Sequence, residues 1–204
     1  MKDLFFEVPS SLIKIRKAYI ILDKNGVVNQ VGTTPLGEDS SKSIEVEITN
    51  DDIFNQPNNY RFVEGRLILD KELALKNAKN KQDYLLNEAC QAAIYQGFDF
   101  NVNGEIVIFP FNKEEQAKLQ EAMMLFESEL LDELMWTVKK DGVPTRVMIT
   151  KEMSDDLSLA ALMHISHNIS TYRNVLLPLV MKAETIEEVE KVTWNIKDLE
   201  KKKD

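Results

Sequence analysis

The sequence has 204 residues, a formal net charge of −9 and one cysteine, Cys90. A chain of this length buries a core without disulfides or metal ions, and a single cysteine excludes an intrachain disulfide. The acidic charge argues against nucleic-acid binding and against docking on anionic membranes, and no stretch approaches the roughly 18 apolar residues that span a bilayer.

Residues 1–70 are predicted to form a small N-terminal β domain. We expect two hairpins and one further strand, over residues 13–23 with 27–31, residues 59–63 with 66–69, and residues 44–48. Asn25-Gly26 separates the first two runs, and this pair is typical of a type I′ turn, in which both residues have positive φ. Glu64-Gly65 occupies the same place in the second hairpin. Together these segments predict one antiparallel sheet of about four strands.

Residues 71–96 contain no Gly or Pro and are predicted to form a long helix that links two domains. Gly97 follows as a candidate for the left-handed residue that ends many helices. Cys90 lies in an alanine-rich stretch of this helix, so we expect a small packed residue instead of a nucleophile.

Residues 97–196 are predicted to form a second, mainly helical domain with β-hairpins, which makes the fold class α+β. Its hairpins are expected over 98–102 with 105–109 and over 136–140 with 143–150, around Asn103-Gly104 and Asp141-Gly142. Its helices are expected from Asn112, as N-cap, to about Met135, from Ser154 or Asp155 to a kink or end near Pro178, and over a short segment after Thr185. Residues 197–204 form a charged tail that is expected to fray.

Two histidines are the sharpest candidates for chemistry. His164 and His167 stand three residues apart on a predicted helix, so they share nearly one face. A metal site needs further ligands, and the sequence points to none, which favours a hydrogen-bonded role in a packed helix. The paired acids Asp51-Asp52, Glu114-Glu115 and Glu187-Glu188 are adjacent and therefore do not face each other on a helix. We predict no enzyme activity, no cofactor and no metal.

Large aromatic side chains are the remaining candidates. Trp136 and Trp194 are the best anchors, either for an interface or for the core. The methionines gather in the second domain, where they suit a flexible core or an adaptable binding surface.

The second domain resembles a phage-tail domain family of uncharacterised function, found in phages of Gram-positive bacteria. The resemblance covers about residues 80–196. It rests on residues 85–98, an aromatic strand end that leads into a Glu-Gln-Leu helix, Trp136 before a Lys-Asp-Gly turn, Tyr172-Arg173, and a run from Thr185 to Trp194. Residues 60–67 look like part of the small sheet that often precedes this domain.

The resemblance implies a structural component of the tail or baseplate that works through contacts with other tail, baseplate or fibre proteins. One alternative is a tail-fibre assembly chaperone, and a second is a protein that binds carbohydrate receptors of the host cell wall. Its place would be the virion tail, or the host cytoplasm during assembly, and tail symmetry favours a homo-oligomer such as a trimer or hexamer. The family assigns no catalytic residue. Trp136, Trp194 and Tyr172 are carried over only as landmarks that serve in contacts or in the core.

Overall fold

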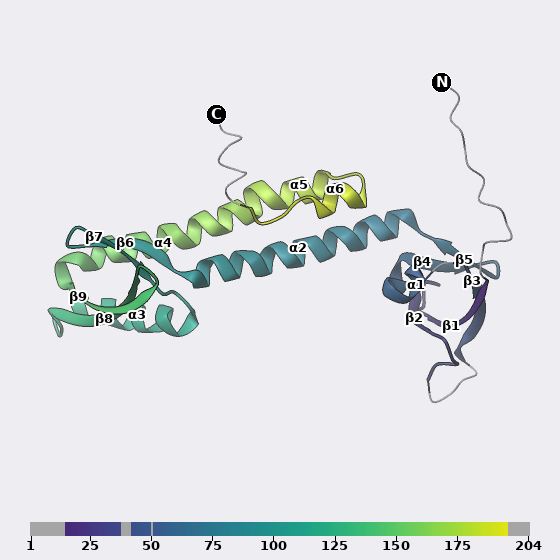
Figure 1. Cartoon of the computed structure of the whole chain (residues 1–204), viewed down its shortest axis with the longest axis horizontal. Helices are drawn as coiled ribbons and strands as arrows, with labels where there is room; N and C mark the ends of the chain where they lie inside the picture. Colours follow the sequence, from purple (N-terminus) through teal and green to yellow (C-terminus); the bar gives the residue numbers. More distant parts are fainter. Residues whose placement is uncertain (1–14, 38–41, 50, 196–204) are drawn as a thin grey trace, which may run out of the picture. The chain divides into compact units, whose positions relative to one another are not determined.

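The computed structural model describes residues 15–37, 42–49 and 51–195 (Figure 1). The fold is α+β, as predicted, with small antiparallel sheets and a long helix. Contacts divide the chain into an N-terminal unit, Met1–Asn80 with Glu184–Ile186, and a C-terminal unit, Lys81–Ala183 with Glu187–Asp204. The predicted tail, residues 197–204, lies outside the described residues.

The described part of the N-terminal unit contains five strands in two sheets. Its elements are β1 (Arg16–Leu22), β2 (Val28–Gly32), β3 (Ile44–Ile48), the short helix α1 (Asp52–Asn55), the 3-10 turn η3 (Pro57–Asn59), β4 (Tyr60–Val63) and β5 (Arg66–Leu69). One sheet has the order β2-β1-β3, and β4 and β5 form a second, two-stranded sheet. The prediction of a single four-stranded sheet is therefore wrong. Within the described residues, the isolated bridge between Val27 and Arg61 and the hydrogen bond from the Phe62 N–H to the Gly26 carbonyl, at 3.0 Å, link the two sheets.

The first turn also differs from the prediction. Gly26 has a φ of +75°, whereas Asn25 has no positive φ, so the turn is not type I′. The Asp23 carboxylate accepts the backbone N–H groups of Asn25 at 2.8 Å and Val27 at 2.9 Å. This local bonding by an aspartate stabilises a longer turn. The other three predicted hairpin turns, at 64–65, 103–104 and 141–142, have positive φ at both residues and are confirmed.

Helix α2 (Lys71–Gln96) covers the predicted range, beginning in the N-terminal unit and ending in the C-terminal unit. Asp70 caps its start, because its carboxylate accepts the N–H of Leu73 at 2.9 Å. Asp70 also forms an ion pair with Arg61 at 2.6 Å. At the other end, Gly97 has a φ of +97° and confirms the expected left-handed residue.

The C-terminal unit packs helices on one face of a four-stranded antiparallel sheet. Its elements are β6 (Phe98–Val102), β7 (Glu105–Phe109), α3 (Lys113–Glu127), β8 (Glu133–Lys140), β9 (Val143–Thr150), η4 (Lys151–Met153), α4 (Ser154–Ser170), the π-helix η5 (Thr171–Leu176), α5 (Leu177–Lys182) and, in its larger part, α6 (Ile186–Glu190). The sheet order is β6-β7-β8-β9. The sheet's inner face, the end of α2, α3 and α4 contribute to one core.

Helix α3 ends eight residues before the predicted Met135. Asn112 caps its start as predicted, accepting the N–H groups of Glu114 and Glu115. At its end Glu129 has a φ of +59°, its N–H bonds to the carbonyl of Phe126, and the N–H of Leu130 bonds to that of Leu125. This pair of bonds is a Schellman motif, which normally has glycine at the left-handed position.

The helix near Pro178 does not end there. Helices α4, η5 and α5 follow one another without a break to Lys182. Proline has no N–H to donate, and its ring crowds the carbonyl four residues earlier. We attribute the wider π turn at Thr171–Leu176, directly before this proline, to that conflict.

Candidate functional site

Trp136 belongs to the core of the C-terminal unit. It projects from the inner face of β8, is 8% exposed, and stacks on Phe109 with ring centroids 6.5 Å apart. Phe109 in turn contacts the rings of Phe98 and Phe100. The Trp136 Nε1 group has no hydrogen-bond partner among the described protein atoms. The indole therefore contributes through packing.

Tyr172 and Trp194 contact the same core from its edge. The Tyr172 hydroxyl, on η5, donates a hydrogen bond to the Asp83 carboxylate on α2. Close by in the sequence, the Gln82 side chain donates to the Val192 carbonyl at 2.6 Å, two residues before Trp194. Both Tyr172 and Trp194 are partly buried against the core cluster that contains Trp136. The three landmarks thus meet around one core.

The Tyr172–Asp83 bond predicts a pH dependence. The hydrogen bond to Asp83, followed by burial, raises the pKa of Tyr172 to about 12. A pKa raised above the unfolded value of about 10 contributes stability that is present below pH 10 and is lost as the pH rises through 12. Urea unfolding of the wild type and Tyr172→Phe should show a stability difference that shrinks across this interval. A difference that stays constant to pH 12 would contradict the assignment.

His164, on α4, bonds to a backbone carbonyl in the last turn of α2 and shows no metal-site geometry. Its Nε2 lies 3.0 Å from the carbonyl oxygen of Ile94, which can only accept, so this nitrogen carries the proton. Asn168 lies 3.4 Å from Nδ1 and donates to the His164 carbonyl at 2.8 Å. His167 is exposed, and no group of three His, Cys, Asp or Glu residues in the described part of the chain could hold a metal ion. The arrangement ties α4 to the end of α2.

Cys90 and the paired acids also have local roles. Cys90 is buried, and this burial raises the pKa of its thiol, which disfavours the reactive thiolate. Lys118 forms ion pairs with Glu114 and Glu115 at 3.0 and 3.1 Å, in the first turns of α3. Asp51 pairs with Arg16 at 2.5 Å.

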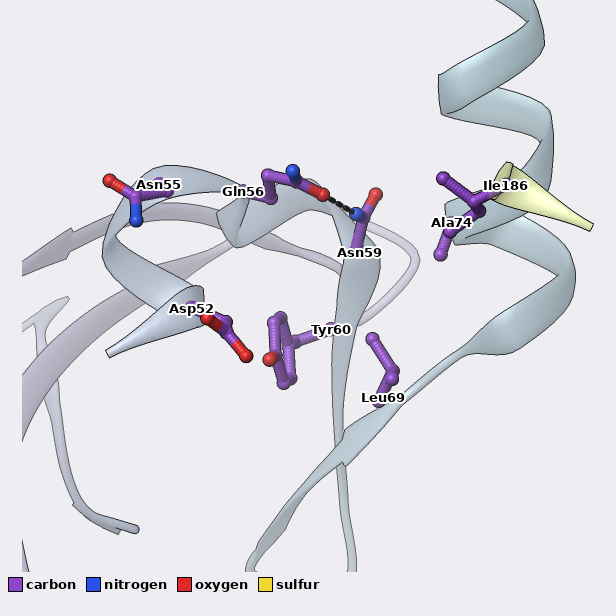
Figure 2. Close-up of a pocket in the computed structure, with 8 residues that line it drawn as sticks. All are labelled: Asp52, Asn55, Gln56, Asn59, Tyr60, Leu69, Ala74 and Ile186. Carbon is purple, nitrogen blue, oxygen red and sulfur yellow. Dashed lines mark hydrogen bonds between the residues drawn. The ribbon is translucent and has the colours of Figure 1, made fainter. Parts of the chain in front are cut away.

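A pocket of about 270 Å³ lies in the N-terminal unit (Figure 2). Its lining comprises Asp52, Asn55, Gln56, Asn59, Tyr60, Leu69, Ala74 and Ile186. Such amides and phenols can bind sugar hydroxyls, but Asn59 is already engaged. It donates to Gln56 at 2.6 Å and accepts from Asn77 at 2.8 Å. These bonds hold η3 against the start of α2, so Asn59 and Gln56 serve the fold.

The outer face of the C-terminal sheet carries exposed apolar side chains among polar ones such as Asp99 and Lys139, which flank Ile108. Ile106 and Ile108 on β7 are exposed, as are Met135 and Met148, which pair across β8 and β9. Alternation along β7 places its other apolar residues, Val107 and Phe109, in the core. A strand that is apolar on both faces is the sequence signal of a sheet covered on both sides.

Comparison of this chain with protein-family models, curated proteins and solved structures finds no match. None of the described helices has the length and apolar character needed to cross a membrane.

Proposed function

We propose that this chain is a structural component of a bacteriophage tail or baseplate and acts through protein–protein contacts. The resemblance supports this role, since it spans about residues 80–196 and the C-terminal unit begins at Lys81. Its landmarks Trp136, Tyr172 and Trp194 all contact one core. The residues that carry the resemblance therefore belong to one packed unit.

The observation that carries the contact role is the set of exposed apolar side chains on the outer face of the sheet. Ile106 is 62% exposed and Ile108 is exposed beside it on β7, while Met135 and Met148 form a second exposed apolar pair across β8 and β9. Exposed apolar surface on an acidic protein is costly in water and is typical of a protein-binding site. Methionine adapts its shape to a partner, which suits assembly with another tail protein.

Quantitative mass spectrometry of purified particles of the encoding phage tests this role. We expect the chain at a fixed copy number, and we expect Ile106→Glu to lower its incorporation by about tenfold or more, because the glutamate must be desolvated at the contact. Val143→Glu is the matched control, since Val143 is 61% exposed but projects from the other side of the sheet by strand alternation.

Absence of the chain from particles would overturn the virion role. If co-expression then raised the solubility of the fibre protein, the chain would be an assembly chaperone instead. Equal incorporation of both variants would show that the outer sheet face makes no contact in the particle.

A further inference from the structure

Helix α4 has an apolar stripe on the side that faces away from the core. Leu157 and Ala161 are buried on its inner side. Leu159, Leu162 and Ile169 are exposed on the other side, and Leu162 is 63% exposed. Figure 1 shows α4 running beside the second part of α2, to which His164 ties it. The apolar stripe is thus a surface that the C-terminal unit leaves uncovered.

The stripe has the spacing of a coiled-coil seam. Its positions are Asp155, Leu159, Leu162, Ser166, Ile169 and Arg173, and they are separated by alternating steps of four and three residues. Such steps average 3.5 residues, the repeat that keeps one face of a helix against a partner helix. The seam is about 27 Å long at 1.5 Å per residue. We call these six positions the α4 seam.

The α4 seam carries opposite charges at its two ends. Asp155 opens it in the first turn of α4, and Arg173 closes it one turn after Ile169, in η5. Both side chains are exposed. Neither forms a salt bridge with another residue of the part of the chain that the structure describes. An acidic end and a basic end make the seam complementary to its own reversed copy.

We propose that a second copy of this chain docks on the α4 seam. The two α4 helices run antiparallel and are related by a two-fold axis that crosses the seam at the level of His164. The seam positions are symmetric about this residue: 155 faces 173, 159 faces 169, and 162 faces 166 of the other copy. Each Asp155 then meets an Arg173, and the leucines pack against Ile169 and Ser166. A parallel pair would instead place Asp155 against Asp155 and Arg173 against Arg173.

This pairing is a closed, isologous dimer, because the same surface is used on both copies. It leaves the outer face of the sheet free for other partners, since that face belongs to β7, β8 and β9. The pairing stands without the proposed tail function. It replaces the trimer or hexamer favoured by tail symmetry with a two-fold unit.

Sedimentation equilibrium of the full chain tests the docking. We expect a dimer in the wild type, and we expect Leu162→Glu to raise the dissociation constant by about 100-fold or more, because two glutamates enter an apolar seam. Leu130→Glu is the matched control and should leave the dimer unchanged, since Leu130 is 75% exposed and lies outside the seam. Circular dichroism checks that both variants are folded.

Charge reversal tests the antiparallel orientation with surface substitutions that leave the core intact. Asp155→Arg or Arg173→Asp alone should raise the dissociation constant about tenfold, since each creates two like-charge contacts. The double variant Asp155→Arg/Arg173→Asp should restore the wild-type value. A monomer at all concentrations, a trimer or larger assembly, a dimer indifferent to Leu162→Glu, or a double variant that fails to restore pairing would each overturn the proposal.

Discussion

Replacing Gly97 by alanine is expected to destabilise the C-terminal unit by about 3 kcal/mol or more, a large effect for one methyl group. Gly97 has a φ of +97°, which strains any side chain. A Cβ atom there would lie 2.0 Å from the carbonyl oxygen of Phe109 and 3.1 Å from the Cα of Pro110. Both neighbours are backbone atoms, so the junction between α2 and the sheet must shift to accept the methyl group.

Gly104→Ala is the matched control for this prediction. Gly104 has a φ of +90°, but no atom lies within 4 Å of the added Cβ. We expect a loss of only about 1 kcal/mol, from backbone strain alone. Urea unfolding followed by tryptophan fluorescence measures both, because the chain's two tryptophans, Trp136 and Trp194, both belong to the C-terminal unit. Equal losses for the two variants would contradict the close approach at Gly97.

The elements that the sequence predicts best are those with a local physical signal. Strands β6 and β7 have the predicted ranges because Asn103-Gly104 favours positive φ at both turn positions. Helix α3 starts where Asn112 supplies an acceptor for two N–H groups. In each case residues adjacent in the chain determine the geometry, so no knowledge of distant contacts is needed.

The elements that were predicted wrongly depend on signals that the sequence lacks. Glu129 ends α3 in a left-handed conformation that glycine usually provides, so the sequence predicts a helix that extends into β8. No prediction covers the joining of the two C-terminal hairpins, because it rests on the pairing of Ile108 with Lys139, which are far apart in the sequence. Asn25 does not adopt the predicted conformation with positive φ, because the Asp23 carboxylate stabilises a different turn.

The candidate surfaces were only partly visible in the sequence. The four-three spacing along α4 can be counted from the residues, but helical spacing alone does not tell a buried stripe from an exposed one. The buried positions Leu157 and Ala161 settle this question only when the core is known. The sequence predicts the aromatic landmarks as anchors of either the core or a contact, and the choice between these two roles depends on their packing.

Trp136→Ala is expected to destabilise the C-terminal unit by about 3–5 kcal/mol, because removing a buried indole leaves a cavity among the core aromatics. Trp136→Phe should cost far less, about 1–2 kcal/mol. A phenyl ring preserves the stack on Phe109, and the variant loses no protein hydrogen bond, since Nε1 has no partner among the described atoms. Urea unfolding followed by the fluorescence of Trp194 gives both values.

Met135→Ala is the control on the same strand. Met135 precedes Trp136 but projects from the outer face, where it is exposed, so its loss should change stability by no more than about 0.5 kcal/mol. A surface anchor at position 136 would behave like Met135, and both alanine variants would then unfold at the same urea concentration as the wild type. A large loss for Trp136→Ala, with recovery in Trp136→Phe, assigns this landmark to the core and leaves partner contacts to the outer sheet face and the α4 seam.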